Sequence, residues 1–280
     1  MTLLQVVVLA LIQGLTEFLP VSSSAHLIFP SKLLGWNDQG LAFDVAVHVG
    51  TLLAVVCYYL SDLVKLSTYT IEACVRRRQT PISKVGFCLI IATIPVCISG
   101  LLFEEQISSW GRSLEVIAWT TIGYGLLLGL ASYLNRHFIW PNIINNEGGR
   151  ADSLRGLGYV QAIIIGLSQA LAIVPGTSRS GITLTAGLFL GLRPEAAARF
   201  SFLLSIPVIL ASATFEGVKL YRYPELFDKA DYLSMSLGVL LSFFTALMVI
   251  HLFMKFIAKS GMALFVIYRL LLGFTLLWLF

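Results

Sequence analysis

Charged side chains are scarce in this sequence. Asp, Glu, Lys and Arg together make up 12% of the 280 residues, and the mean hydropathy is +0.85, whereas roughly a quarter of an ordinary soluble chain is charged. No long polar block interrupts the apolar runs between Leu3 and Phe280. This excludes a soluble domain held by one anchor. It predicts an all-α polytopic membrane protein whose single membrane domain covers residues 1–280.

Cysteine motifs and basic stripes are also lacking. The four cysteines show no CxxC spacing, and three of them lie in apolar stretches, so packing is a better interpretation than a metal site or a disulfide. The net charge of +4 is modest, and no basic stripe with interleaved aromatic residues occurs. This argues against nucleic acid as a partner. The first apolar segment lacks the basic region that precedes the apolar part of a signal peptide. Because apolar runs recur along the whole chain, the expected partner is membrane lipid.

Six apolar stretches approach the roughly 20 residues that a helical crossing needs. They lie near 43–60, 85–103, 114–134, 200–217, 233–254 and 262–280. Two further apolar regions, residues 2–34 and 157–192, are each broken near the middle by proline and a cluster of hydroxyl residues. Each of these regions predicts two half-helices around a turn. The expected fold has six spanning helices plus two re-entrant helix pairs.

The two broken regions resemble each other. Gly-Leu-Thr-Glu before a proline in the first matches Gly-Leu-Ser-Gln before a proline in the second, at residues 14–17 and 166–169. Each half would hold three crossings, and an odd number inverts the second half. We therefore expect inverted repeats at about 1–134 and 157–280, joined by a cytoplasmic loop 135–156. In such repeats the broken helices place a polar site near the midplane of the membrane.

The basic residues indicate an orientation. Lys65, Arg76, Arg77, Arg78 and Lys84 form the most basic connection, and Lys and Arg concentrate on the cytoplasmic side of membrane proteins. Alternation from this connection places both termini on the outer face.

Gln13 and Glu17 share one face of the first apolar segment, because residues four apart on a helix are neighbours. A carboxylate at the membrane centre costs about 2.5 to 3.5 kcal/mol on insertion scales. Glu17 should therefore face a cavity or a partner, as a metal ligand or a proton acceptor. The alternative is a structural ion pair that joins the two halves.

Three serines and a histidine follow Pro20. Ser22, Ser23 and Ser24 open a second half-helix, and a helix N-terminus is a ready anion site. His26 lies three residues beyond Ser23, which on a helix brings the imidazole to the hydroxyl side and allows acid–base chemistry. Helix capping by the serines is the alternative.

Arg179 is the most informative residue of the second broken region. It lies in the run Pro175–Thr183, and a guanidinium fork in an apolar segment matches phosphate oxygens bidentately. The hydroxyls of Ser178, Ser180 and Thr183 add donors. A snorkelling arginine is the alternative. A carboxylate, a histidine, a guanidinium and a ring of hydroxyls at the midplane together predict a phosphate site.

His48 and Asp44 could also reach this cavity. The alternative for His48 is a histidine buried in the core.

The stretches at 13–26 (QGLTEFLPVSSSAH) and 175–183 (PGTSRSGIT) are similar to the two signature regions of undecaprenyl-pyrophosphate phosphatase, the bacitracin-resistance family, and 200–207 (FSFLLSIP) resembles a third. The resemblance runs along the whole chain. It implies hydrolysis of undecaprenyl pyrophosphate to undecaprenyl phosphate and inorganic phosphate at the outer, periplasmic face of the bacterial inner membrane. That reaction recycles the lipid carrier of cell-wall synthesis and confers bacitracin resistance. A divalent cation, magnesium or calcium, is also implied.

The same resemblance implies roles for individual residues. Ser23 is the candidate nucleophile, Glu17 the metal ligand or base, His26 the acid–base partner and Arg179 the pyrophosphate clamp. The other residues expected to bind substrate are Ser178, Ser180, Thr183, Ser22, Ser24 and Gln13.

Two other functions share some of these sequence features. An inverted-repeat transporter or lipid flippase would share the architecture, but it needs no nucleophile. Another lipid phosphatase family carries a Pro-Ser-Gly-His run, which this chain lacks. The sequence leaves the oligomeric state open, with a homodimer among the candidates.

Overall fold

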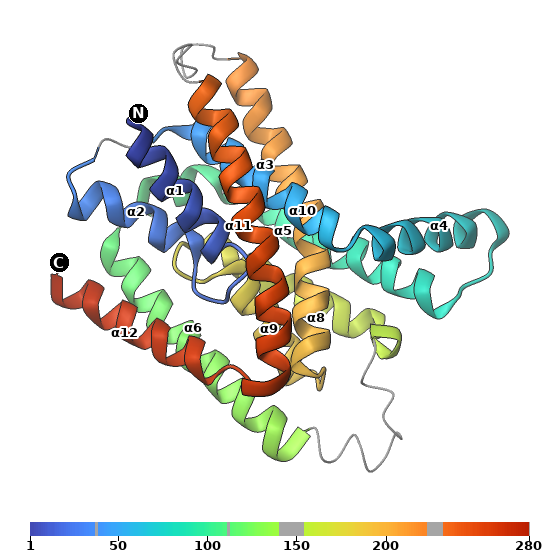
Figure 1. Cartoon of the computed structure of the whole chain (residues 1–280). Coiled ribbons are helices and arrows are strands. Elements are labelled where there is room, and N and C mark those ends of the chain that lie inside the picture. The colour runs from blue at the N-terminus through green and yellow to red at the C-terminus, as the bar shows by residue number, and fades with distance from the viewer. Residues whose placement is uncertain (37–38, 111–112, 140–153, 223–231, 280) are drawn as a thin grey trace.

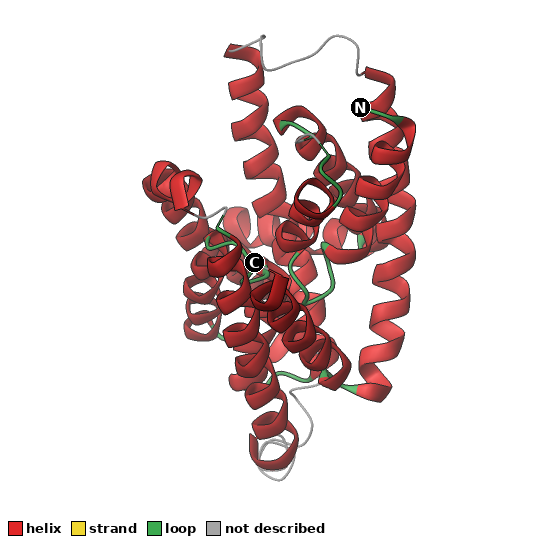
Figure 2. Ribbon diagram, turned by 90° about the vertical axis from the view of Figure 1, so that its left-hand side faces the viewer, coloured by secondary structure: helices red, strands yellow, loops and turns green. Residues whose placement is uncertain are grey.

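The structure is a computed structural model, which describes residues 1–36, 39–110, 113–139, 154–222 and 232–279. Within these ranges the chain forms helices and turns and no strand (Figure 2). The expected all-helical class is therefore confirmed for the part of the chain that the structure describes. The expected loop 135–156 lies mostly outside the described residues.

Five helices of the described ranges are long and apolar enough to cross a membrane. They are α3 (Leu41–Tyr58), α5 (Pro81–Trp110), α6 (Leu114–Leu134), α10 (Pro194–Arg222) and α11 (Tyr232–Ser260). Each coincides with one of the six apolar stretches. The sixth stretch forms α12 (Ala263–Leu279), which has 17 residues. At 1.5 Å per residue it is about 26 Å long, slightly less than the roughly 30 Å hydrocarbon core of a bilayer.

Both broken apolar regions form two short helices around a turn. The first gives α1 (Leu3–Thr16) and α2 (Ser23–Leu33). The second gives α8 (Tyr159–Ala170), a single turn η4 (Leu171–Ile173) and α9 (Arg179–Phe189). With at most 14 residues each, none of these α-helices can span a bilayer alone. The predicted breaks are confirmed.

Helix α4 (Leu60–Arg76) was not expected from hydropathy. It begins directly after α3 and projects with the start of α5 from the rest of the molecule (Figure 1). Leu60, Val64, Ile71 and Val75 are exposed along it, and its other faces carry charged residues. An amphipathic helix of this kind has too little mean hydropathy to be read as a crossing. Two short elements, η1 (Asn135–Ile139) and η3 (Leu154–Gly156), complete the described structure.

The two halves of the chain pack into each other. Helix α1 packs on α11 of the second half, and α8 packs on α5 of the first half. A glycine permits each close approach: a Cβ on Gly14 would lie 2.9 Å from the Ser242 carbonyl oxygen, and one on Gly166 would lie 2.7 Å from that of Ala92. Small residues at such crossings let helix backbones approach closely in membranes. These two glycines stand at matching positions of the predicted repeat.

We expect Gly166→Ala to destabilise the protein, because the added methyl would force α8 away from the α5 backbone. Overpacking of this kind costs about 1 to 3 kcal/mol, which should lower the melting temperature measured in detergent by several degrees. The matched control is Gly123→Ala in α6, where a Cβ would meet nothing within 4 Å. Equal melting temperatures for the two variants would contradict the close approach.

Candidate active site

The turns of the two broken regions have the same local conformation. Ser22 precedes α2 with φ 73° and ψ 97°, and Ser178 precedes α9 with φ 70° and ψ 110°. Positive φ is uncommon and strained for residues other than glycine. The Ser22 and Ser24 hydroxyls lie 3.1 Å apart, and those of Ser178 and Ser180 lie 3.2 Å apart. The residue that follows the strained serine is Ser23 in one turn and Arg179 in the other.

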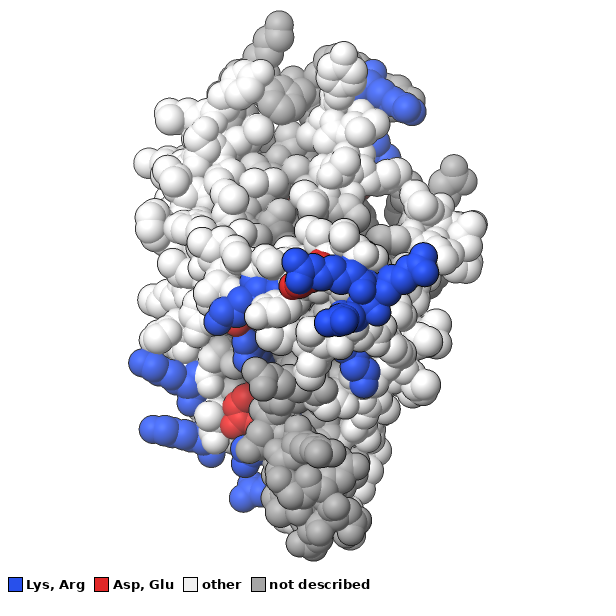
Figure 3. Space-filling model, turned by 90° about the vertical axis from the view of Figure 1, so that its right-hand side faces the viewer, with Lys and Arg blue, Asp and Glu red and all other residues white. Residues whose placement is uncertain are grey.

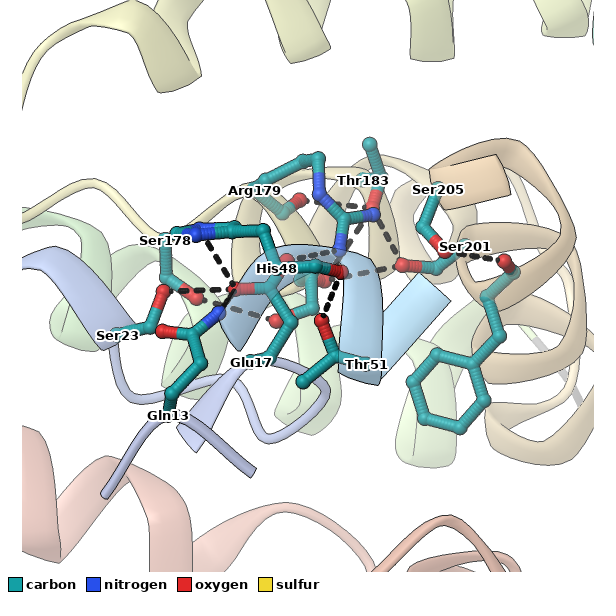
Figure 4. Close-up of polar contacts among 12 residues, drawn as sticks. Gln13, Glu17, Ser23, His48, Thr51, Ser178, Arg179, Thr183, Ser201 and Ser205 are labelled. Carbon is teal, nitrogen blue, oxygen red and sulfur yellow. Dashed lines mark hydrogen bonds and ion pairs between the residues drawn. The ribbon is translucent and has the colours of Figure 1, made fainter. Parts of the chain in front are cut away.

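Glu17 joins these two turns (Figure 4). Arg179 Nη2 donates to Glu17 Oε1 at 2.9 Å, and Ser23 Oγ donates to Glu17 Oε2 at 2.9 Å. Gln13 Nε2 also donates to Oε2, at 3.0 Å, as the i, i+4 spacing on α1 predicts. Glu17 is 7% exposed. The carboxylate is therefore held between an arginine of one half and a serine of the other.

A cavity of about 340 Å³ opens at this carboxylate. Its polar lining comes from Glu17, Ser22, Ser23, Ser24, Asp44, His48, Ser178, Arg179, Ser212 and Glu216. Its apolar lining comes from α3, α10 and η4, at Leu41, Val45, Ala172, Val208, Ile209 and Ala213. The cavity is thus amphipathic, which suits a ligand with an anionic head and a hydrocarbon tail.

Part of the Arg179 guanidinium makes no hydrogen bond within the described residues. Its Nη2 is used by Glu17, while its Nη1 is buried without a hydrogen-bond partner. An unsatisfied buried donor costs about 1 to 3 kcal/mol. Since the side chain lines the cavity, an acceptor brought there by a ligand would remove this cost. A phosphate oxygen is an acceptor that guanidinium groups bind well.

Four of the predicted site residues lie outside the cavity lining. Gln13 is fully buried and contacts Glu17. Ser180 donates to the Leu19 carbonyl oxygen at 2.9 Å, and Thr183 donates to the Arg179 carbonyl oxygen at 2.9 Å. Both hydroxyls therefore bind the backbone of the turn regions. Their roles in substrate binding stay predictions.

His26 is the fourth. Its Nδ1 lies 2.7 Å from the Ser22 carbonyl oxygen, and its Nε2 lies 2.5 Å from the Tyr268 hydroxyl. The His26 and Tyr268 rings are stacked. The structure brings this imidazole to α12 rather than to the Ser23 hydroxyl, and its acid–base role also stays a prediction.

His48 is the histidine that reaches the cavity. Its Nδ1 lies 2.7 Å from the Asp44 carbonyl oxygen, and its Nε2 lies 3.8 Å from Glu17 Oε2. The sequence left His48 open between a cavity residue and a core residue. The structure places it at the cavity, because its helix α3 passes beside the first turn.

Arg269 was missed from the sequence altogether. It lies in α12 and is fully buried. Its guanidinium donates to carbonyl oxygens of both turns, at Pro20 (3.2 Å), Gly176 (2.9 Å) and Thr177 (3.0 Å), and to that of Thr121 in α6 (3.1 Å). An arginine inside an apolar stretch was the available signal.

The donor set limits how a metal could bind. In the described ranges, no three His, Cys, Asp or Glu side chains are grouped to hold a metal ion. Both oxygens of Glu17 already accept hydrogen bonds. Magnesium, however, usually keeps several waters and binds through one or two carboxylates plus substrate phosphates. Glu17 and Asp44 line the cavity and have the oxygen donors that a cation of that kind binds, without forming a closed protein site.

The fold and the site together define a class, a multi-pass helical membrane protein with a buried Glu17–Arg179 pair at an amphipathic cavity. Residues 6–275 match the family described as bacitracin resistance protein BacA, and the chain belongs to this family. The resemblance found in the two signature regions is confirmed.

Relatives of similar length carry one activity in their names. An undecaprenyl-diphosphatase of Hahella chejuensis is 50% identical over 281 residues, which cover 100% of this chain and 99% of the relative. One of Teredinibacter turnerae is 49% identical over 276 residues, covering 99% and 98%. Undecaprenyl-diphosphatase 2 of Stutzerimonas stutzeri is 47% identical over 280 residues, covering 100% and 99%.

The contact between Glu17 and Arg179 predicts strong coupling between their substitutions. Glu17→Gln should destabilise the protein by about 3 kcal/mol, because it leaves a buried guanidinium without its carboxylate. Arg179→Gln should cost a similar amount for the converse reason. The double variant should be destabilised by less than the sum of the two, as a double-mutant cycle of unfolding free energies would measure. Additive costs would contradict the ion pair.

Proposed function

We propose that the protein hydrolyses undecaprenyl pyrophosphate to undecaprenyl phosphate and inorganic phosphate. This reaction recycles the lipid carrier for cell-wall synthesis, and it confers resistance to bacitracin. Membership of the BacA family and the names of the full-length relatives support this activity. The structural observation that carries it is Arg179, which lines a cavity together with serine hydroxyls and has one buried guanidinium nitrogen, Nη1, without a hydrogen-bond partner among the described residues.

The two ends of this substrate match the two kinds of cavity wall. The pyrophosphate meets Arg179 Nη1 and the hydroxyls of Ser22, Ser24 and Ser178. The backbone N–H groups at the start of α2 and α9 add a favourable helix dipole. The prenyl chain leaves along the apolar residues of α3 and α10 toward lipid.

Ser23 is the attacking group in this proposal. Its hydroxyl donates to Glu17 Oε2, so Glu17 can take the hydroxyl proton and release it to cavity water. The Ser23 oxygen then forms a bond to the terminal phosphorus, the bond from phosphorus to the bridging oxygen breaks, and undecaprenyl phosphate leaves. Water displaces the serine oxygen in the second step. One water proton stays on the released phosphate, and the other restores the Ser23 hydroxyl.

Positive charge is the other requirement of phosphoryl transfer, since negative charge spreads over the transferred oxygens. Arg179 supplies a fixed guanidinium for these oxygens. A divalent cation, magnesium or calcium, would neutralise further phosphate charge when bound. Glu17 and Asp44 are the residues that would hold it together with the substrate.

The finer architecture belongs to the same proposal. We assign the two broken regions as re-entrant pairs of an inverted repeat and α12 as the sixth crossing, in the bacterial inner membrane. The shared conformation of Ser22 and Ser178 supports the repeat. The face that α4 presents carries clustered basic side chains (Figure 3). Arg76 and Arg78 line a pocket there together with Glu72. This face is assigned to the cytoplasm, which turns the cavity toward the periplasm. A homodimer stays a prediction.

The proposed activity is tested by phosphate release from a C55 pyrophosphate by the purified protein, with and without magnesium or calcium. Release of inorganic phosphate by the parent protein is the expected result. Translocation of the lipid without phosphate release would instead favour a flippase or transporter.

Serine substitutions in the same assay identify the nucleophile. Ser23→Ala should reduce phosphate release by at least about a thousandfold with little change in melting temperature, because no other hydroxyl of the described residues donates to Glu17. Ser24→Ala is the matched control and should retain a measurable rate. If Ser23→Ala keeps a sizeable fraction of the parent rate, water is the attacking group and Ser23 only binds phosphate.

The two histidines can be separated in the same way. His48→Leu should lower turnover by about tenfold, because it removes the polar group beside Glu17, and His48→Gln should recover most of it. His26→Gln should act mainly on melting temperature, since His26 contacts Ser22 and Tyr268. Loss of turnover in His26→Gln with an unchanged melting temperature would support His26 as the acid–base group.

A further inference from the structure

Arg269 is a buried cation that no step of the proposed reaction uses. Its four hydrogen bonds all go to backbone carbonyl oxygens, one on the first turn, two on the second turn and one on α6. No carboxylate of the described residues lies within ion-pair distance of its guanidinium. Carbonyl oxygens satisfy its N–H groups, but they do not neutralise its charge. A buried charge without a counter-ion is costly in a protein interior, so its retention calls for a functional reason.

The carbonyls that Arg269 contacts belong to the catalytic turns. Pro20 lies between Glu17 and Ser23 in the chain, while Gly176 and Thr177 directly precede Ser178 and Arg179. Buried carbonyls in a turn at membrane depth have no water and no helical partner, so they need donors from elsewhere. One planar guanidinium supplies donors to both turns at once. The distance between the turns is therefore fixed by the width of a single side chain.

Two glycines pack closely against the Arg269 side chain. A Cβ on Gly125 of α6 would lie 3.0 Å from Arg269 Cβ, and one on Gly181 of α9 would lie 3.1 Å from Arg269 Nη1. The neighbouring Tyr268 contacts His26 of α2. Helix α12 thus holds the first turn through Tyr268 and both turns through Arg269.

We propose that Arg269 is the positioning residue of this site. It fixes the separation of the two turns so that Ser23 and Arg179 reach the two oxygens of Glu17 together, and its unneutralised charge favours an anion in the cavity. This inference rests on the proposed phosphatase function, because it concerns the same cavity. Arg269 itself does not contact the substrate, and it acts through the two turns.

The first test compares Arg269→Lys with the parent protein for phosphate release from a C55 pyrophosphate, well below both melting temperatures. Lysine keeps the charge but cannot donate in three directions at the spacing of a guanidinium. We expect kcat to fall at least about tenfold. The control is Phe265→Leu, a buried α12 residue that packs on Phe253 and Phe256. It should lower melting temperature and leave kcat within about twofold.

A gentler pair of variants covers the case in which Arg269→Lys does not fold. Gly125→Ala would press on the Arg269 side chain, whereas Gly129→Ala adds a methyl one turn further along α6, against Val266 of α12. Both variants disturb the same helix interface. We expect kcat to fall about three- to tenfold in Gly125→Ala and to stay within about twofold in Gly129→Ala. Equal effects on kcat in these two variants would overturn the proposal.

Inorganic pyrophosphate gives a readout that does not depend on turnover. It should raise the melting temperature of the parent protein and of Phe265→Leu, and it should protect Arg269→Lys or Gly125→Ala less. If the parent binds pyrophosphate but releases no phosphate from the lipid, the proposed function fails while this arm still tests Arg269. Normal protection and normal kcat in folded Arg269→Lys would show that Arg269 is only structural.

Discussion

The ion pair between Glu17 and Arg179 is the interaction on which the site depends. It joins two turns that lie 162 residues apart in the chain, and one carboxylate receives donors from both of them. In water such a pair would contribute little. Here the carboxylate is buried between half-helices of a membrane protein, so either charge left alone would be costly. Contact between the two turns therefore stabilises the fold, and the cavity opens beside this contact.

Several costly features converge at the same point. Ser22 and Ser178 hold strained positive φ angles, and the short helices α2 and α9 begin directly after them. A second arginine, Arg269, is buried without a carboxylate of the described residues within ion-pair distance. Packing of the remaining helices offsets these costs, through close crossings such as α1 on α11 and α8 on α5. Strain and unpaired donors at one cavity are typical of a functional site. Rigid packing around the cavity keeps hydrogen-bond donors in position for the negative charge that develops only in the transition state.

The sequence was most informative where burial of charge restricts the alternatives. Glu17 and Arg179 stood out because polar residues inside apolar segments must face one another or a cavity, and both broken regions followed from proline and hydroxyl clusters. Ser23 was distinguished from Ser22 and Ser24 only by the family resemblance. Helix periodicity could not predict that the His26 ring contacts Tyr268, a partner 242 residues away. Neither the buried role of Arg269 nor helix α4 was predicted from the sequence, for related reasons. The role of Arg269 depends on carbonyls of distant turns, and α4 is too polar to stand out by hydropathy. Residue spacing within one helix cannot report such tertiary contacts.

The central claim is that Arg179 serves two acceptors at once, Glu17 through Nη2 and a substrate phosphate through Nη1. The most direct measurement is phosphate release from a C55 pyrophosphate by Arg179→Lys, beside Arg199→Lys, whose arginine pairs with Asp62 away from the cavity lining. Since a lysine cannot present two parallel donors, turnover by Arg179→Lys should fall more than about tenfold while Arg199→Lys stays near the parent rate. Near-parent turnover by a folded Arg179→Lys protein would contradict the account.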